Sequence, residues 1–272
     1  MKSLLASVVL VLSLTASAEP VYTIGVEQAE FLPHYQGDAA GNYHGFARDV
    51  FDRFVAHSGV RLTLRVMPAE ALLPALLDGT IDAKYPDSPE WSVQAKGGSS
   101  VHYSQPVVDY VDGVMVAPRR AGLGIDALRR LAVVDGWTPR GYEDRIAADQ
   151  ISLVSTGDLP RMVRQALLKD VDGAYYNVVV AAHYLNNVRA KPGALVFDSG
   201  LPHSRGTFAL SSIHHPALIR RFDQFLEQQR VEIAALKARY QVEANLSSEY
   251  IGMEQWKVDF IERQKSRQLT RP

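Results

Sequence analysis

The stretch ALLDGTIDAKYPDSPEW, residues 75–91, indicates how this chain builds its fold. A helix-like apolar run ends at Asp78 and Gly79, and the short apolar segment that follows predicts a strand at residues 81–84. A helix that leads directly into a strand is the repeating unit of α/β proteins. Residues 84–91 then combine prolines, acids, a tyrosine and a tryptophan. A loop of that composition at a strand end either caps the sheet or binds a ligand.

The preceding segments repeat this alternation of strand and helix. Residues 21–26 and 62–66 predict strands, and residues 45–57 and 69–77 predict helices. Gly59 is well placed to end the first helix, because glycine accepts the left-handed conformation found at helix C-termini. The resulting order predicts a sheet with parallel strands and right-handed crossovers.

A second α/β unit follows in the other half of the chain. The sequence predicts strands at residues 131–134, 151–154 and 173–176 and helices at residues 159–168 and 178–185. Extended segments at residues 110–117 and 208–210 are predicted to connect the two units. A long amphipathic helix that packs on the core is predicted from the spacing of Ile219, Phe222, Leu226, Ile233, Leu236 and Tyr240. A last helix is expected within residues 246–267.

The composition is that of an average soluble globular protein, with 272 residues, 47% hydrophobic and 22% charged. The formal net charge of -1 argues against nucleic-acid or polybasic membrane contacts. Lys2, an apolar run at residues 4–12 and Ala18 after small residues predict a secretory signal peptide over residues 1–18. Because cysteine is absent, we expect no disulfide and no lipid anchor, and therefore a free periplasmic protein.

Four short motifs carry a resemblance to a known family. GNYHGFARDV at residues 41–50, the segments 72–83 and 103–107, and DVDGAY at residues 170–175 occur in an order similar to that of the periplasmic solute-binding proteins of the amino-acid type, family 3. The departures described below place the chain in an atypical branch. The resemblance implies a type II periplasmic-binding-protein-like α/β fold, with two lobes joined by a two-strand hinge. Its boundaries are lobe 1 at residues 19–112 and 210–272, lobe 2 at residues 116–203, and hinge strands at residues 113–117 and 204–210.

Ligands of open α/β sheets lie beyond the carboxyl ends of the strands, which places the loop at residues 84–91 on the cleft wall. Its backbone and hydroxyl groups, with Asp87 and Ser88, are candidates for polar contacts, and Tyr85 and Trp91 for contacts with the body of a ligand. The alternative is that the prolines stiffen a surface loop and Trp91 belongs to the lobe core.

Lobe 2 is expected to contribute Trp137 and Thr138, with Tyr142 and Tyr176 nearby. Thr138 followed by Pro139 reads as a helix start, and a helix N-terminus can receive a carboxylate. The alternative is a structural helix cap. In lobe 1 the resemblance makes Phe31 an aromatic residue that stacks on the ligand.

Two departures from the family pattern concern the ligand. No arginine follows the lobe 1 loop, where the family pairs the α-carboxylate of an amino acid, and Lys96 is the nearby cation. Asn177 stands where the resemblance implies an ammonium-binding aspartate, and an amide does not compensate a charge. We therefore expect a polar organic ligand other than an ordinary α-amino acid, with an acidic group near Lys96 or Thr138 and an apolar or aromatic part.

The sequence favours a binding protein over an enzyme. Some exported proteins resembling this family are dehydratases of cyclic acids, which need a general acid, and Asp87, Glu90 and Glu143 are the candidates. Nucleophile-elbow, zinc-protease and phosphate-loop motifs are absent from the sequence. We expect a monomer without metal or cofactor that delivers a small molecule to an inner-membrane ABC permease. A ligand-sensing role is the further alternative.

Overall fold

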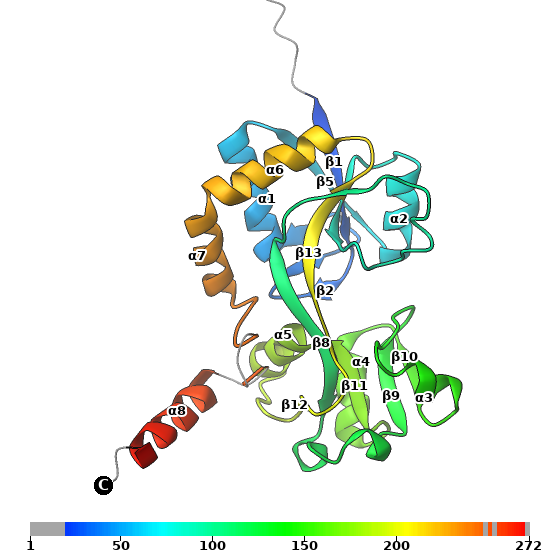
Figure 1. Cartoon of the computed structure of the whole chain (residues 1–272), viewed down its shortest axis with the longest axis vertical. Coiled ribbons are helices and arrows are strands. Elements are labelled where there is room, and N and C mark those ends of the chain that lie inside the picture. Colours follow the sequence, from blue (N-terminus) through cyan, green and yellow to red (C-terminus); the bar gives the residue numbers. More distant parts are fainter. Residues whose placement is uncertain (1–19, 247–249, 252–254, 270–272) are drawn as a thin grey trace, which may run out of the picture.

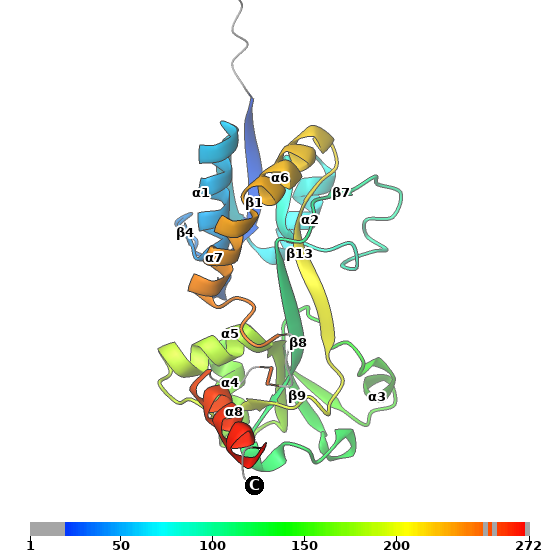
Figure 2. The same ribbon diagram turned by 60° about the vertical axis from the view of Figure 1, so that its left-hand side comes forward.

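The computed structural model describes residues 20–246, 250–251 and 255–269, so the predicted signal peptide lies outside the described residues. Two α/β halves lie one above the other in Figure 1. Two long strands, β8 (Val108–Val116) and β13 (Ser204–Ser212), run antiparallel between the halves, side by side in Figures 1 and 2. Both halves therefore belong to one continuous sheet, in the order β10-β9-β11-β8-β13-β6-β1-β5.

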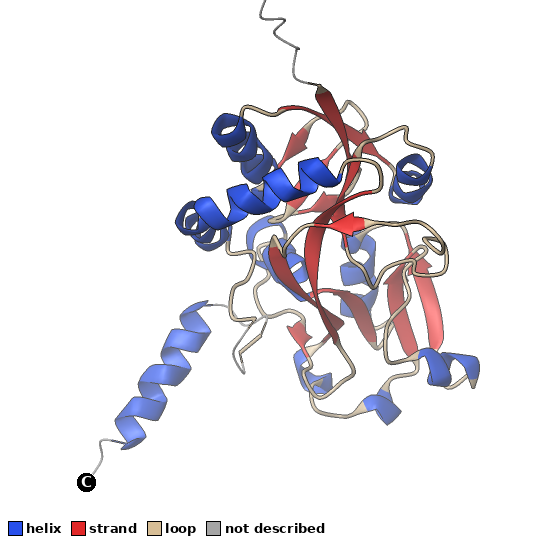
Figure 3. Ribbon diagram, turned by 45° about the horizontal axis from the view of Figure 1, so that its top comes forward, coloured by secondary structure: helices blue, strands red, loops and turns tan. Residues whose placement is uncertain are grey.

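The first half is built on three parallel strands, which are β1 (Val21–Glu27), β5 (Arg61–Met67) and β6 (Ala83–Asp87). Its main helices are α1 (Phe46–Ser58), α2 (Ala69–Leu77), α6 (Pro216–Gln228) and α7 (Arg230–Tyr240). The short strands β2 (Glu30–Phe31), β3 (Tyr35–Gly37) and β4 (Tyr43–His44) form a separate small sheet, and β7 (His102–Tyr103) pairs with β13. In Figure 3 the helices lie on both sides of the strands.

Aromatic side chains hold α1 and α6 together. Phe54 on α1 and Phe222 on α6 are fully buried, with ring centroids 5.0 Å apart in an edge-on arrangement. Burial of one such side chain contributes about 1.5–3 kcal/mol. Helix α1 ends where Gly59 adopts a left-handed conformation, with φ of 71°, as the sequence predicted.

The second half contains β9 (Arg130–Val134), β10 (Ser152–Thr156) and β11 (Gly173–Asn177). Strands β9, β10 and β11 pair in parallel, and β11 is antiparallel to β8. The remaining elements are α3 (Glu143–Ala147), α4 (Leu159–Leu168), α5 (Val178–His183), a π-helical turn (Tyr184–Val188), β12 (Val196–Phe197) and two 3-10 turns (Pro118–Arg120 and Ile125–Ala127).

Most predicted elements are confirmed, and the exceptions have physical reasons. The helix expected from Thr138 is wrong: residues 137–139 form no helix or strand, and α3 starts only at Glu143. The strand predicted at residues 81–84 lies later, at Ala83–Asp87, because β13 pairs with it as far as Asp87. The single long amphipathic helix is instead α6 and α7, which are separated at Gln229.

The last helix is α8 (Gln255–Leu269), which overlaps the segment 246–267 where a helix is expected and ends two residues beyond it. The expected boundaries assign residues 210–272 to the first lobe, whereas α8 lies at the level of the second half in Figures 1 and 2. Among the described residues, no helix combines the length and the apolar character needed to span a bilayer.

Candidate functional site

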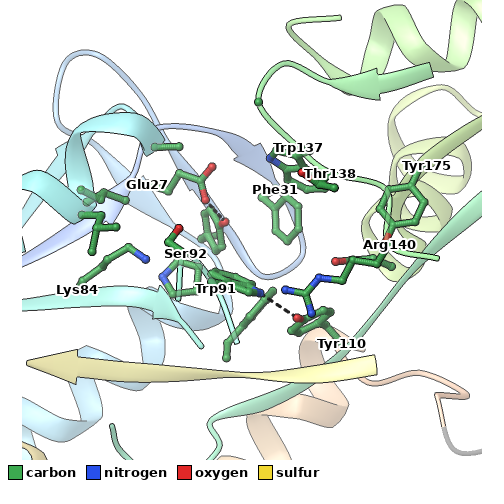
Figure 4. A pocket seen from close by; sticks show the side chains of 18 residues that line it. Glu27, Phe31, Lys84, Trp91, Ser92, Tyr110, Trp137, Thr138, Arg140 and Tyr175 are labelled. Atoms are coloured by element: carbon green, nitrogen blue, oxygen red, sulfur yellow. Dashed lines mark hydrogen bonds between the residues drawn. The ribbon is translucent and has the colours of Figure 1, made fainter. Parts of the chain in front are cut away.

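A cavity of about 350 Å³ lies between the two halves, with hinge strands β8 and β13 contributing to its wall (Figure 4). This volume is within the range of small-molecule sites. Its lining residues come from both halves and from the hinge, and they are Glu27, Phe31, Tyr35, Ala69, Leu72, Leu73, Lys84, Pro86, Trp91, Ser92, Tyr110, Asp112, Gly136, Trp137, Thr138, Arg140, Tyr175 and Phe208.

Aromatic rings form much of the cavity wall. Phe31 of the first half faces Trp137 of the second, with ring centroids 6.3 Å apart. Trp137 is stacked on Tyr176, at 5.1 Å and an interplanar angle of 11°. Trp91 donates from Nε1 to the hydroxyl of Tyr110 on the hinge at 3.0 Å. The wall is therefore suited to a planar or apolar ligand body.

A buried charge cluster lies behind the first-half wall. Asp87 is fully buried, and its Oδ1 accepts from Lys84 Nζ at 3.0 Å and from Lys96 Nζ at 2.9 Å. Ser211 on β13 donates to Asp87 Oδ2 at 2.7 Å. Burial alone raises the pKa of Asp87, but the lysines and Ser211 outweigh burial and lower it. Burial lowers the pKa of Lys84, although the negative charge of Asp87 acts to raise it.

Two carboxyl groups on the cavity wall have raised pKa values. Burial raises the pKa of Glu27, although the hydrogen bond from Tyr35 at 2.5 Å and the charge of Lys84 oppose it. Burial also raises the pKa of Asp112 on the hinge strand to about 7, despite a hydrogen bond from Asn177 Nδ2 at 3.3 Å. Both groups are therefore more readily protonated than ordinary surface acids.

Arg140 extends from the second half toward the first. Its Nη1 lies 3.1 Å from Glu90 Oε2, and Nη2 donates to the Glu90 carbonyl at 3.4 Å. Figure 4 places the guanidinium beside Tyr110 and Trp91. The ion pair joins the two halves, but the side chains are 38% and 62% exposed, so it contributes little stability.

Four of the eleven predicted ligand-binding residues line the cavity, namely Phe31, Trp91, Trp137 and Thr138. The other seven lie outside its lining, namely Tyr85, Asp87, Ser88, Lys96, Tyr142, Tyr176 and Asn177. The geometry of the first-half loop differs from the expectation because β6 continues as far as Asp87 and places the ring of Tyr85 in the core, 5.3 Å from the ring of Phe51.

Lys96, Ser88 and Asp87 have structural partners in place of cavity contacts. Lys96 Nζ binds Asp87 and donates to the Ser88 carbonyl at 2.8 Å, and it is 7% exposed. The cation that lines the first-half wall is therefore Lys84 rather than the expected Lys96.

In the second half, three of the predicted residues make structural contacts outside the cavity lining. Tyr142 donates its hydroxyl to the Pro202 carbonyl at 2.9 Å. Asn177 is fully buried and caps α5, accepting from the backbone N–H of Val180 at 3.1 Å. Tyr176 backs the ring of Trp137. Thr138 lines the cavity, but the expected helix N-terminus is absent from that position.

Sequence reasoning missed several lining residues, among them Lys84, Arg140, Glu27 and Asp112. Two of these residues could have been identified from their positions in the sequence. Arg140 directly follows Trp137, Thr138 and Pro139, and Lys84 ends the predicted strand. The hinge residues Tyr110 and Phe208 lie in the two segments predicted to connect the halves, so their aromatic rings could have been assigned to the cleft.

The three candidate general acids are not placed on the cavity wall. Asp87 has a lowered pKa, Glu90 is an exposed partner of Arg140, and the exposed Glu143 accepts from the Gly141 N–H at 2.7 Å. Within the described part of the chain, no cluster of three histidine or acidic side chains is arranged to hold a metal ion.

Comparison with protein-family models and with curated proteins finds no match. Solved structures do match. A histidine kinase sensor domain similar to periplasmic binding proteins has a TM-score of 0.67 and 17% identity, covering 82% of this chain and 96% of its own. An ancestral amino-acid-binding protein, a precursor of cyclohexadienyl dehydratase, has a TM-score of 0.63 and 17% identity, covering 81% and 94%. The GluR0 ligand-binding core in complex with L-glutamate has a TM-score of 0.64 and 14% identity, covering 82% and 99%.

At these identities the likeness establishes the fold, and it confirms the fold class expected from the sequence. The chain has the two-lobed, periplasmic-binding-protein-like α/β fold.

Proposed function

We propose that this protein binds a small organic solute between its lobes and delivers it to an inner-membrane ABC permease. The solute carries an acidic group and an aromatic or apolar part. The observation that supports the proposal is the cavity, whose wall combines aromatic rings from both lobes with the cations Lys84 and Arg140. Closure of the lobes encloses the solute and presents a surface to the permease. The protein acts as an exported monomer without metal or cofactor.

The proposed solute differs from an ordinary α-amino acid. Asn177, at the position of the expected ammonium-binding acid, is a buried helix cap whose amide donates to Asp112. The arginine on the cavity wall comes from the second lobe, at residue 140. Both features change the pattern of charges that an amino-acid zwitterion needs.

Two other functions remain candidates. One solved structure of similar fold is a precursor of cyclohexadienyl dehydratase. The general acids expected from the sequence, Asp87, Glu90 and Glu143, lie outside the cavity lining, whereas Glu27 and Asp112, whose pKa values are raised, line it. Another solved structure of similar fold is a sensor domain of a histidine kinase, which supports a ligand-sensing role. Deletion of the gene separates transport from sensing, because loss of solute uptake is expected only for a transport protein.

The decisive experiment is mass spectrometry of any small molecule that co-purifies with the protein, followed by a thermal-shift screen against organic acids. A bound solute is expected to raise the melting temperature, because it binds the folded state alone. Trp91→Ala is expected to abolish this shift, and Val93→Ala is a control in the same loop, since Val93 is 61% exposed. The absence of any ligand, or a selective response to one common α-amino acid, would contradict the proposal. Turnover of a cyclic hydroxy acid would favour the enzyme.

A further inference from the structure

The cluster behind the first-lobe wall contains two cations, Lys84 and Lys96, and one carboxylate, Asp87, and the nearby Glu27 carboxyl also acts on Lys84. Lys84 and Lys96 both bind Oδ1 of Asp87, and the three side chains are only 10%, 7% and 0% exposed. A buried charge without a counter-charge is costly, so this cluster favours the arrival of an anion. Lys84 is the member that lines the cavity, while Lys96 also binds the Ser88 carbonyl. An anion can therefore reach the cluster through Lys84.

A second cation, Arg140, lies on the opposite side of the cavity. Arg140 offers five N–H donors, and Glu90, the carboxylate that it binds, is 62% exposed to solvent. A planar carboxylate inside the cavity makes a stronger forked pair with a guanidinium than a solvated surface partner does. Figure 4 shows Lys84 and Arg140 on opposite sides of Trp91, and Lys84 Nζ lies 5.6 Å from the Trp91 ring centroid.

We propose that the solute is an organic dianion with a planar, aromatic or unsaturated body. One acid group pairs with Lys84 of the first lobe, the other pairs with Arg140 of the second lobe, and the body lies along Trp91. This inference rests on the proposed solute-binding function and deepens it. Because the two cations belong to different lobes, both acid groups are bound only when the lobes enclose the solute. A monoanion pairs with only one of the two cations.

The alternative ligand is a zwitterion, because the carboxyl groups on the wall could bind its ammonium group. An ammonium group would need Glu27 or Asp112 as its partner. Each of these carboxyls already interacts with a nearby cation, Glu27 with Lys84 and Asp112 with Arg140. An ammonium group bound to either carboxyl would therefore be repelled by that cation. In protonated form, either carboxyl can donate a hydrogen bond to a bound acid group. The raised pKa values of Glu27 and Asp112 favour this protonated form, in which neither carboxyl repels an anion, so two anionic groups suit Lys84 and Arg140 on the wall better than a zwitterion does.

The test compares four probes on the purified full-length mature chain by calorimetry. They are benzene-1,4-dicarboxylate, its monomethyl ester, 4-(aminomethyl)benzoate as the zwitterion, and hexa-2,4-dienedioate as a planar dianion without a ring. We expect at least one dianion to bind about tenfold or more tighter than the monoester and the zwitterion, since each lost charge-assisted pair weakens binding by about that factor.

Variants assign the two acid groups to the two cations. Lys84→Met and Arg140→Gln are each expected to weaken dianion binding about tenfold or more and to remove the preference over the monoester. Lys84→Met leaves Asp87 paired with Lys96, so its fold is expected to persist. Arg145→Gln is the matched control, because Arg145 pairs with Asp126 and is absent from the cavity lining.

The outcomes separate this inference from the proposed function. Tighter binding of the monoester or the zwitterion, or no binding of either dianion, overturns the inference, and it does so in the unaltered protein, whatever the variants do. Solute binding itself then stands if another compound co-purifies or raises the melting temperature. If no compound does so, the proposed function fails together with the inference.

Discussion

Asp87→Asn tests whether the buried cluster at the cavity wall depends on its single carboxylate. The substitution preserves the shape of the side chain and removes its charge. Lys84 and Lys96, with side chains 10% and 7% exposed, would then face each other without a counter-ion. We expect a large loss of stability, because an unpaired buried charge costs far more than the pair itself contributes.

The magnitude follows from the number of interactions lost. Removal of one partner from a buried ion pair costs about 3–5 kcal/mol, and Asp87 has two lysine partners, which favours about 4–5 kcal/mol. For a chain of this size each kcal/mol lowers the melting temperature by about 2–4 °C, so a decrease of about 8–20 °C is expected. Burial already lowers the pKa of Lys84, so the loss is expected to shrink at alkaline pH, where this lysine releases its proton.

Urea unfolding, monitored by circular dichroism, measures this loss. The urea concentration at the midpoint is expected to fall, while the slope of the unfolding free energy against urea concentration stays unchanged. Addition of Lys84→Met and Lys96→Met to the Asp87→Asn variant is expected to restore most of the stability, because none of the three cluster side chains then carries a charge. Asp52→Asn is the matched control, since Asp52 is 56% exposed in its pair with Arg48. A loss below about 1 kcal/mol in Asp87→Asn, similar to the control, would refute the reasoning.

Three further predictions concern groups around the hinge and cavity. Asp112 has a folded-state pKa of about 7, above its ordinary 3.8, so its stabilising contribution falls as pH rises between these values. Asp112→Asn should therefore stabilise the unliganded protein most above neutral pH, which urea midpoints across a pH series will measure. Burial lowers the pKa of His34 from 6.5 to about 3, so stability is lost as pH falls through this range, and His34→Phe should reduce the acid sensitivity of the melting temperature. Gly113→Ala would place a Cβ 2.5 Å from the Phe197 ring, so we expect a lower melting temperature from strain at the hinge.

Elements with strong local signals were predictable from sequence. Helix α4 over Leu159–Leu168 has the predicted bounds, and Asp158 accepts from the Arg161 N–H at 2.7 Å as its N-terminal cap. The apparent helix start at Thr138 failed because tertiary contacts override the local preference. Trp137 is stacked on Tyr176, residues 138–139 form no helix or strand, and residues 140–141 form a turn in which Gly141 has φ of 84°.

The candidate site was harder to predict because its geometry depends on partners that are distant in sequence. A stretch with Asp87, Ser88 and Glu90 reads as an exposed, ligand-facing loop. The burial of Asp87 depends on β13, whose Ser211 lies 124 positions away and binds Asp87. Periodicity shows which face of an element is apolar, but it does not show which charges a remote strand will enclose.

The aromatic wall described above has a practical consequence. Two of the chain's three tryptophans, Trp91 and Trp137, line the same cavity from different lobes. Indole emission depends on the polarity of its surroundings, and water leaves both rings when a guest fills the space. The intrinsic fluorescence of the unlabelled protein is thus expected to report occupancy directly, with the Trp137→Phe and Trp91→Phe variants separating the signals of the two lobes.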